Sequence, residues 1–246
     1  MEKERERFSV RFAETEEEKR GAYALRFRDM LQEYRQDVEN EDGLDITPYD
    51  AYAKQVVCID NETGEVVGCY RIVTSDDLPS GSPFVSEEEF VLDGLKATGE
   101  RIAELSRAVV KKEYRNSAVL MLLLRFIVGY IRKAGYRFVV GDASFYGTDK
   151  NLYKKEISYL AHYAPIDEKY AVKSLDKEQI ALLDVDEIDE RASRQALPPL
   201  IRAYHAFGAR FSTGSFTDYA FGSVDLFVLL DTQNYNEAYV ARLLKV

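Results

Sequence analysis

The stretch 104–124 constrains the fold of this chain more than any other part of the sequence. Apolar and polar positions partly alternate over residues 102–110, which predicts a β-strand. An apolar run over residues 118–131 follows after a short turn and predicts a buried helix that ends at Gly135. A strand that leads through a turn into a helix is a building unit of mixed α/β folds.

The turn between this strand and this helix is basic. It carries Lys111, Lys112 and Arg115, and Asn116 or Ser117 stands where a helix N-cap is expected. The N-terminus of a helix beside three cations is suited to bind an anion, most often a phosphate. The sequence therefore predicts a phosphate site here, with a solvated basic turn as the alternative.

The remaining elements predict a sheet with helices around it. We expect strands over residues 8–12, 55–60, 65–74, 137–143 and 224–230, and helices over 15–39, 149–160 and 194–207 with a short one at the C-terminus. Thr15 and Glu18 form a capping-box pattern, and residues 61–64 read as the turn of a β-hairpin. This order indicates an α/β (α+β) fold whose mixed sheet is antiparallel at the hairpin and parallel where a helix crosses over. We expect one domain, 1–246, with an elaborated C-terminal third.

Composition excludes several classes of protein. The net charge of −10 argues against a general nucleic-acid binder. The run 118–131 contains Arg125 and is shorter than the roughly 20 residues that span a bilayer. The charged N-terminus does not resemble a signal peptide, and Cys58 and Cys69 lack metal-ligand spacing, so we expect a cytoplasmic protein with reduced thiols and no metal site.

Several short strings in the first half resemble the acyl-carrier-protein-dependent branch of the Gcn5-related N-acyltransferase (GNAT) superfamily, which includes acyl-homoserine-lactone synthases. The matching strings are Arg26-Phe27, Tyr49-Asp50, Gly68-Cys69-Tyr70-Arg71 and Glu104-Leu105-Ser106-Arg107. The second half is similar to ornithine N-acyltransferases in residues 143–149, 197–201, Tyr204, Gly208-Ala209, Asp218 and Asp225. One departure is Tyr146, where many relatives carry His.

The resemblance implies a GNAT-like fold with a centrally splayed sheet, and an N-acyltransferase activity. It implies that a fatty acyl group, 3-hydroxylated, passes from acyl carrier protein to the α-amine of an amino acid, with ornithine as the expected acceptor. No cofactor is expected to stay bound, because the donor is the acyl-phosphopantetheine of the carrier. Asn116, Ser117 and Ala118 stand where coenzyme A enzymes carry glycines, which favours a phosphopantetheine arm with a single phosphate. Transient contact with the inner membrane surface is also expected.

These expectations assign roles to individual residues. Glu104 is the candidate base that accepts a proton from the acceptor amine, because an α-ammonium is mostly protonated at pH 7. Arg71 or Arg107 would bind the acceptor carboxylate through a bidentate contact. The other substrate-binding candidates are Arg26, Phe27, Asp50 and Ser144, and the candidates for binding the carrier and its phosphopantetheine are Lys111, Lys112, Arg115, Asn116 and Ser117.

Structural alternatives accompany these roles. Glu104 and Arg107 are three positions apart, so on a regular strand they face opposite sides, and each could pair with another buried charge such as Arg26 or Arg71. Asp50 could have a purely structural role in its loop, and we interpret His162 and His205 as surface or packing residues. Alternative functions are an N-acyl amino acid synthase with glycine or another acceptor, an acyl-homoserine-lactone synthase, and a non-catalytic module that binds an acyl carrier or lipid.

Overall fold

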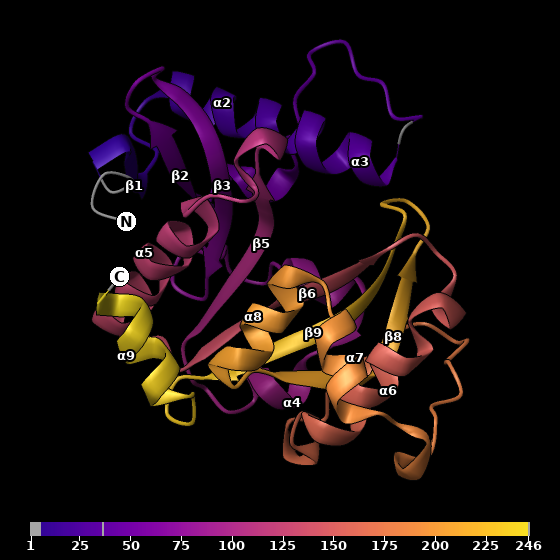
Figure 1. The fold of residues 1–246 in the computed structure, drawn as a ribbon. Helices are drawn as coiled ribbons and strands as arrows, with labels where there is room; N and C mark the ends of the chain where they lie inside the picture. Colours follow the sequence, from indigo (N-terminus) through magenta and orange to yellow (C-terminus); the bar gives the residue numbers. More distant parts are fainter. Residues whose placement is uncertain (1–5, 36, 246) are drawn as a thin grey trace. The chain divides into compact units, whose positions relative to one another are not determined.

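A computed structural model describes residues 6–35 and 37–245. The described chain divides into two compact units (Figure 1). The first comprises the described residues up to Ser80, residues 103–135 and the described residues from Val240 onward, and the second comprises residues 81–102 and 136–239. Each unit is described by itself.

The strands of the first unit lie in the order β1-β2-β3-β5, and all neighbours are antiparallel. Their bounds are Phe8–Phe12 (β1), Lys54–Asp60 (β2), Glu65–Thr74 (β3) and Ile102–Val110 (β5). The predicted hairpin is confirmed as β2 and β3, and Gly64 has the positive φ of 73° that its turn needs. The predicted strand over 102–110 is confirmed as β5.

The first helix of this unit begins as predicted and ends earlier. The Thr15–Glu18 capping box is present and opens α2, Glu16–Arg26. The helix continues as a π-helical turn, Phe27–Leu31 (η1), and ends with α3, Gln32–Tyr34, so the predicted end near Glu39 is wrong. Arg35 leaves the helical conformation, with φ −132° and ψ 89°, and its guanidinium pairs with the Asp37 carboxylate at 2.8 Å. This local ion pair replaces the next helical turn.

Two helices cover opposite faces of the first sheet. Helix α5, Val119–Ala134, ends at Gly135 with φ 75°, as predicted. Cys69 faces α2, since its Sγ lies 3.9 Å from the Ala22 carbonyl oxygen. The preceding residue, Gly68, points to the other face, where a Cβ would lie 2.7 Å from Val119 Cγ1 on α5. The remaining elements that include residues of this unit are η2 (Pro48–Ala51), η4 (Lys112–Tyr114) and α9 (Glu237–Lys245).

The second unit has a three-stranded antiparallel sheet in the order β6-β9-β8. Strands β6, Phe138–Tyr146, and β9, Ser223–Asp231, agree with the predicted strands. Strand β8, Arg210–Asp218, was not expected from the sequence. The alternation of apolar and polar residues in β8 is interrupted. The register of its pairing with β9 shifts between Phe211 and Ser215, in a segment that contains Gly214.

The predicted helices of the second unit are interrupted at identifiable residues. The helix expected over 149–160 begins as a 3-10 turn, η5 (Lys150–Tyr153), and continues as α6, Lys154–Tyr163. The helix expected over 194–207 is two helices, α7 (Glu190–Ala196) and α8 (Pro199–Phe207). Leu197 separates them with an extended ψ of 136°, because a residue before proline avoids the helical region. The short elements are η3 (Val85–Glu88), β4 (Phe90–Val91), α4 (Asp93–Lys96), η6 (Glu168–Tyr170), β7 (Lys173–Ser174) and η7 (Val185–Glu187).

The two faces of the second sheet differ in chemistry. One face carries Ala143, Phe145, Val224 and Leu226, which form an apolar core with α6 and α8. The other face carries Asp142 and Ser144 of β6 and, directly opposite them, Phe227 and Asp225 of β9. Buried carboxylates therefore share the second face with aromatic rings.

The mixed α/β class is confirmed, and the strands of each unit are flanked by helices (Figure 1). The parallel crossover, the central splay and the single domain stay predictions. Among the described residues, no helix is long and apolar enough to cross a membrane.

The close contact at Gly68 predicts a stability difference between two glycine substitutions. Gly68→Ala places a Cβ 2.7 Å from Val119 Cγ1 and 2.9 Å from Leu123 Cδ1, and overpacking of this kind costs about 1–3 kcal/mol. Gly129→Ala on α5 is the matched control, because no atom lies within 4 Å of its new Cβ. Helix propensity favours alanine there by about 1 kcal/mol. Urea unfolding of the three proteins measures both changes, and equal midpoints for both variants would contradict the packing described.

Candidate active site

Strand β5 departs from regular geometry at Arg107. Ser106 pairs with Arg71 of β3, but Val109 pairs with Cys69, so residues 107 and 108 face one residue of the partner strand. Arg107 has a φ of 55°, in the left-handed region that non-glycine residues seldom adopt. The strand therefore contains a β-bulge, a feature that is frequent beside active sites.

The pairing of β3 with β5 brings the central motif residues onto one face. Glu104 pairs with Val73 and Ser106 pairs with Arg71. Paired residues and residues two apart share a face, so Glu104, Ser106 and Arg71 lie on the face that α2 covers. The side chains of Glu104 and Arg71 are both fully buried.

Arg26, the last residue of α2, is the centre of a buried charge network. Its Nε donates to Asp45 Oδ2 at 2.8 Å, and its two terminal nitrogens donate to the two oxygens of Asp50 at 2.8 and 3.0 Å. Asp50 Oδ2 also accepts from the Thr47 backbone N–H at 2.8 Å. Although burial alone raises the pKa of Asp50, these donors hold it at about 2. The network fixes the loop 45–50 against the helix.

Arg71 joins the same network from β3. Its Nε donates to Ser106 Oγ at 2.9 Å and its Nη1 donates to Thr47 Oγ1 at 2.6 Å. Its Nη2 is buried and has no hydrogen-bond partner among the residues that the structure describes. Burial and the neighbouring Arg107 lower the pKa of Arg71 to about 10, while Asp50 and Glu104 oppose this shift. The guanidinium therefore retains one donor for a ligand.

The bulge directs Arg107 into the network. Arg107 Nε donates to Asp45 Oδ2 at 2.9 Å, so this carboxylate oxygen is shared with Arg26. Burial raises the pKa of Asp45, but Arg107 and Arg26 together hold it below its ordinary value. We expected Glu104 and Arg107 to face opposite sides of a regular strand. Because β5 is bulged at Arg107, this expectation does not apply here.

The basic turn after β5 is largely occupied by ion pairs. Lys111 pairs with Glu65 at 2.7 Å, and Arg115 pairs with Glu33 at 2.5 Å. Lys112 is exposed, and no ion pair of its ammonium is found within residues 6–35 and 37–245. Ser117 Oγ accepts from the Val119 backbone N–H at 3.3 Å, close to the start of α5, and Asn116 is exposed. Lys112 could therefore bind a ligand directly, whereas Lys111 or Arg115 would first have to exchange its partner.

The other predicted residues lie at separate places. Phe27 is buried and begins the π-helical turn after Arg26. Ser144 belongs to the second unit, where it lies directly opposite Asp225 of β9. His162 contacts the Leu183 carbonyl oxygen at 2.8 Å, and His205 lies between Tyr159 and Phe211. These contacts agree with packing roles for both histidines.

Sequence reasoning missed Asp45 and Thr47 as members of the network. Both lie in a loop without periodicity, so no pattern indicates where their side chains point. The one available signal was the presence of two acidic residues, Asp45 and Asp50, on either side of Pro48, which begins the short 3-10 helix η2. The arrangement as a whole offers a buried carboxylate at Glu104, an unpartnered guanidinium nitrogen at Arg71 and an irregular strand. A buried carboxylate can act as a base, and a guanidinium nitrogen with a spare donor can bind a carboxylate.

The network predicts a stability loss when one partner is neutralised. Asp50→Asn removes one of the negative charges that balance the buried Arg26 guanidinium. This should lower the free energy of unfolding by about 3–5 kcal/mol. Asp37→Asn at the exposed Arg35 pair is the control and should change stability by less than about 1 kcal/mol.

The loss of stability at acidic pH gives a second test of the network with the same variant. Because the folded-state pKa of Asp50 is about 2, its ionised form stabilises the protein above the ordinary aspartate pKa of 3.8, and this contribution disappears as pH falls from 3.8 towards 2. Wild type should therefore lose more stability than Asp50→Asn across this window in denaturant titrations. Parallel pH curves for the two proteins would contradict the network.

The chain is similar in sequence and fold to known acyltransferases. Residues 25–125 match the model of the acetyltransferase (GNAT) domain. An L-ornithine N(alpha)-acyltransferase of Rhodobacter capsulatus is 27% identical, over 94% of this chain and 93% of that protein. One of Brucella abortus is 26% identical, over 94% and 87%. The solved CoA-dependent acyl-homoserine lactone synthase MesI shares the fold, with a TM-score of 0.52 and 13% identity, over 97% and 96% of the two chains.

The matched domain contains every residue of the buried network, from Arg26 to Arg107. The similarity to curated acyltransferases extends over nearly the whole chain. The chain is thus an N-acyltransferase with a GNAT acetyltransferase domain over residues 25–125.

Proposed function

We propose that this enzyme transfers a 3-hydroxylated fatty acyl group from acyl carrier protein to the α-amine of ornithine. The observation that carries the proposal is the buried pair of Glu104 and Arg71, of which Arg71 Nη2 has no partner within the described residues. The relatives named L-ornithine N(alpha)-acyltransferase support ornithine as the acceptor, because their similarity covers 94% of this chain.

Arg71 is suited to orient the acceptor. A guanidinium binds a carboxylate strongly, and Nη2 is the donor that the network leaves available. Ser106 and Thr47 hold the other nitrogens of Arg71, so the plane of the guanidinium is fixed before the ligand binds. A fixed donor costs little conformational entropy on binding.

Glu104 would accept the proton that the reaction releases. The neutral α-amine attacks the thioester carbonyl carbon, and a proton passes from its nitrogen to the Glu104 carboxylate, directly or through one water. The C–N bond forms while the carbonyl oxygen takes up negative charge. We assign the stabilisation of this oxyanion to backbone N–H groups at the β5 bulge. The C–S bond then breaks, and the phosphopantetheine thiolate leaves and is protonated.

The donor site would lie at the basic turn after β5. Lys112 and the N-terminus of α5 can attract one phosphate and the acidic surface of a carrier protein. Coenzyme A is the alternative donor, since MesI is described as CoA-dependent. The proposed donor and the cytoplasmic location at the inner membrane surface stay predictions.

Expression in a bacterial host without aminolipids tests the activity. Wild type should produce an N-(3-hydroxyacyl)ornithine that mass spectrometry of the lipid extract identifies by its amino-acid fragment. Glu104→Gln keeps the volume of the side chain but removes the base, so we expect product to fall by about 10²–10⁴-fold while the protein stays folded.

Unchanged product from Glu104→Gln would remove this residue from the mechanism. A glycine or lactone product from wild type would instead identify an N-acylglycine or acyl-homoserine-lactone synthase. Binding of acyl carrier protein without any amide product would favour the non-catalytic module.

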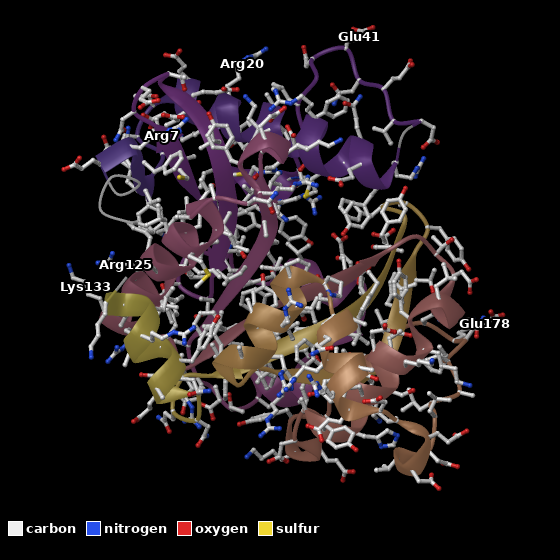
Figure 2. The ribbon with its side chains drawn as sticks, in the orientation of Figure 1. Arg7, Arg20, Glu41, Arg125, Lys133 and Glu178 are labelled. Atoms are coloured by element: carbon white, nitrogen blue, oxygen red, sulfur yellow. The ribbon has the colours of Figure 1, made fainter. Side chains whose placement is uncertain are left out.

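The basic turn predicts a salt-sensitive interaction with the carrier. Lys112→Ala should lower kcat/KM for acyl carrier protein about 3–10-fold at low ionic strength, and the difference should shrink near 0.5 M salt. Lys133→Ala is the control, because this exposed lysine projects outward near the C-terminal end of α5 (Figure 2). Equal losses for both variants, or a loss independent of salt, would contradict carrier binding at the turn.

A further inference from the structure

The first unit has an open groove that the proposed chemistry does not use. The groove lies between β1, α5 and Leu244 near the C-terminus, and its volume is about 640 Å³. Small-molecule sites commonly have volumes of roughly 300–1,000 Å³. Helix α5 covers the face of the sheet opposite to the face that carries Glu104 and Arg71. The groove is therefore separate from the buried charge network.

One wall of the groove is apolar and held in place. Leu122, Phe126 and Tyr130 follow one another at intervals of four residues, so they form a row along α5. The Phe12 ring of β1 packs edge-on against the rings of Phe126 and Tyr130, at centroid distances of 5.1 and 5.0 Å. This wall is thus a preformed surface on which a hydrocarbon chain can be removed from water.

The depth of the groove depends on Gly129. This residue is exposed on α5, and a Cβ at its position would meet no atom within 4 Å. Gly129 is four residues from Arg125 and four from Lys133, so the two cations flank the open space along the helix. A larger side chain at position 129 would enter the groove rather than the core.

The charged residues that line the groove are cations. They are Arg125 and Lys133, and none of the described residues that line the groove is acidic. Neither cation forms an ion pair with another residue of 6–35 or 37–245. Figure 2 shows both side chains projecting outward. Lys133 lies in the last turn of α5, where a cation also stabilises the helix dipole, but Arg125 lies in the middle of the helix and has no such role.

The basic character extends beyond the groove. Residues 119–134 and 240–245 contain no acidic residue, and they contain five cations, Arg125, Arg132, Lys133, Arg242 and Lys245. The whole chain has a net charge of −10. These two segments therefore carry a charge opposite to that of the chain, and they are complementary to an anionic surface.

We propose that this groove binds an acyl chain of an anionic phospholipid at a membrane surface, with the lipid phosphate held by Arg125 and Lys133. An apolar row beside cations is the arrangement by which helices bind anionic membrane interfaces. A free phosphate would leave the apolar wall unused. The volume is that of a small-molecule site, whereas a protein partner typically covers about 800 Å² of surface. The inference rests on the proposed function, whose single-chain lipid product belongs in a membrane.

Sedimentation with vesicles, in the absence of acyl donor and acceptor, tests the groove. Wild type should bind phosphatidylcholine vesicles that contain about one third phosphatidylglycerol roughly 10-fold more tightly than vesicles of phosphatidylcholine alone. Gly129→Gln fills the groove with a neutral polar side chain that also favours the helix, so binding should weaken about 10-fold. Gly129→Ala adds only a methyl group and should bind almost as wild type does.

The cations are tested by a matched pair of double variants. Arg125→Gln with Lys133→Gln should weaken binding to the anionic vesicles about 30-fold, because each cation near such a surface contributes about 5-fold. Arg20→Gln with Lys155→Gln removes the same charge from exposed positions on α2 and α6, and should change binding less than about 2-fold. Melting temperatures identify any variant that is unfolded.

The outcomes separate this inference from the proposed function. Vesicle binding that needs the groove, in a protein that forms no N-acyl product, would support the groove and contradict the proposed function. Wild type that binds neither kind of vesicle, equal losses for the two double variants, or wild-type affinity of Gly129→Gln would overturn the lipid site. Acyl carrier protein binding that the groove variants lose, with vesicle binding intact, would overturn it in favour of a carrier-docking surface.

Discussion

The buried contact between Arg26 and two aspartates is the interaction on which the first unit depends. One guanidinium at the end of α2 engages Asp45 and Asp50, and through Asp45 it is linked to Arg107 in β5. Charges removed from water are tolerated only when each finds opposite charge and hydrogen bonds, and this network supplies both. A helix end, a loop and a strand therefore take up their positions together.

The chemistry of the site follows from this arrangement. Arg71 uses Ser106 and Thr47 to fix its orientation, and one nitrogen remains for a ligand. Arg107 adopts a left-handed conformation, and its contact with Asp45 provides part of the compensation for that strain. The same residues thus stabilise the unit and prepare it for a reaction. For Arg107 and Asp50, a structural role in the network and a role in substrate binding are therefore compatible.

Local patterns predicted local structure well. The β-hairpin, the Thr15–Glu18 capping box and the glycine end of α5 each depend on a few adjacent residues, and all are confirmed. The bulge at Arg107 left no sequence signal, because any residue can occupy it once the surroundings compensate. Strand β8 was not predicted because Gly214 and a register shift interrupt its alternation of apolar and polar residues. The partners of Asp45 depend on tertiary contacts, which a single sequence does not encode in its periodicity.

The order of the chain in the first unit has a consequence for its synthesis. This unit takes its residues from three separate segments, and the last begins at Val240. Leu244 lines one cavity with Phe8 and Phe126, so an apolar surface formed early is completed only by the final helix. During translation that surface stays uncovered until α9 has left the ribosome. A chain cut before Val240 would expose the side of this surface that Phe8 and Phe126 form.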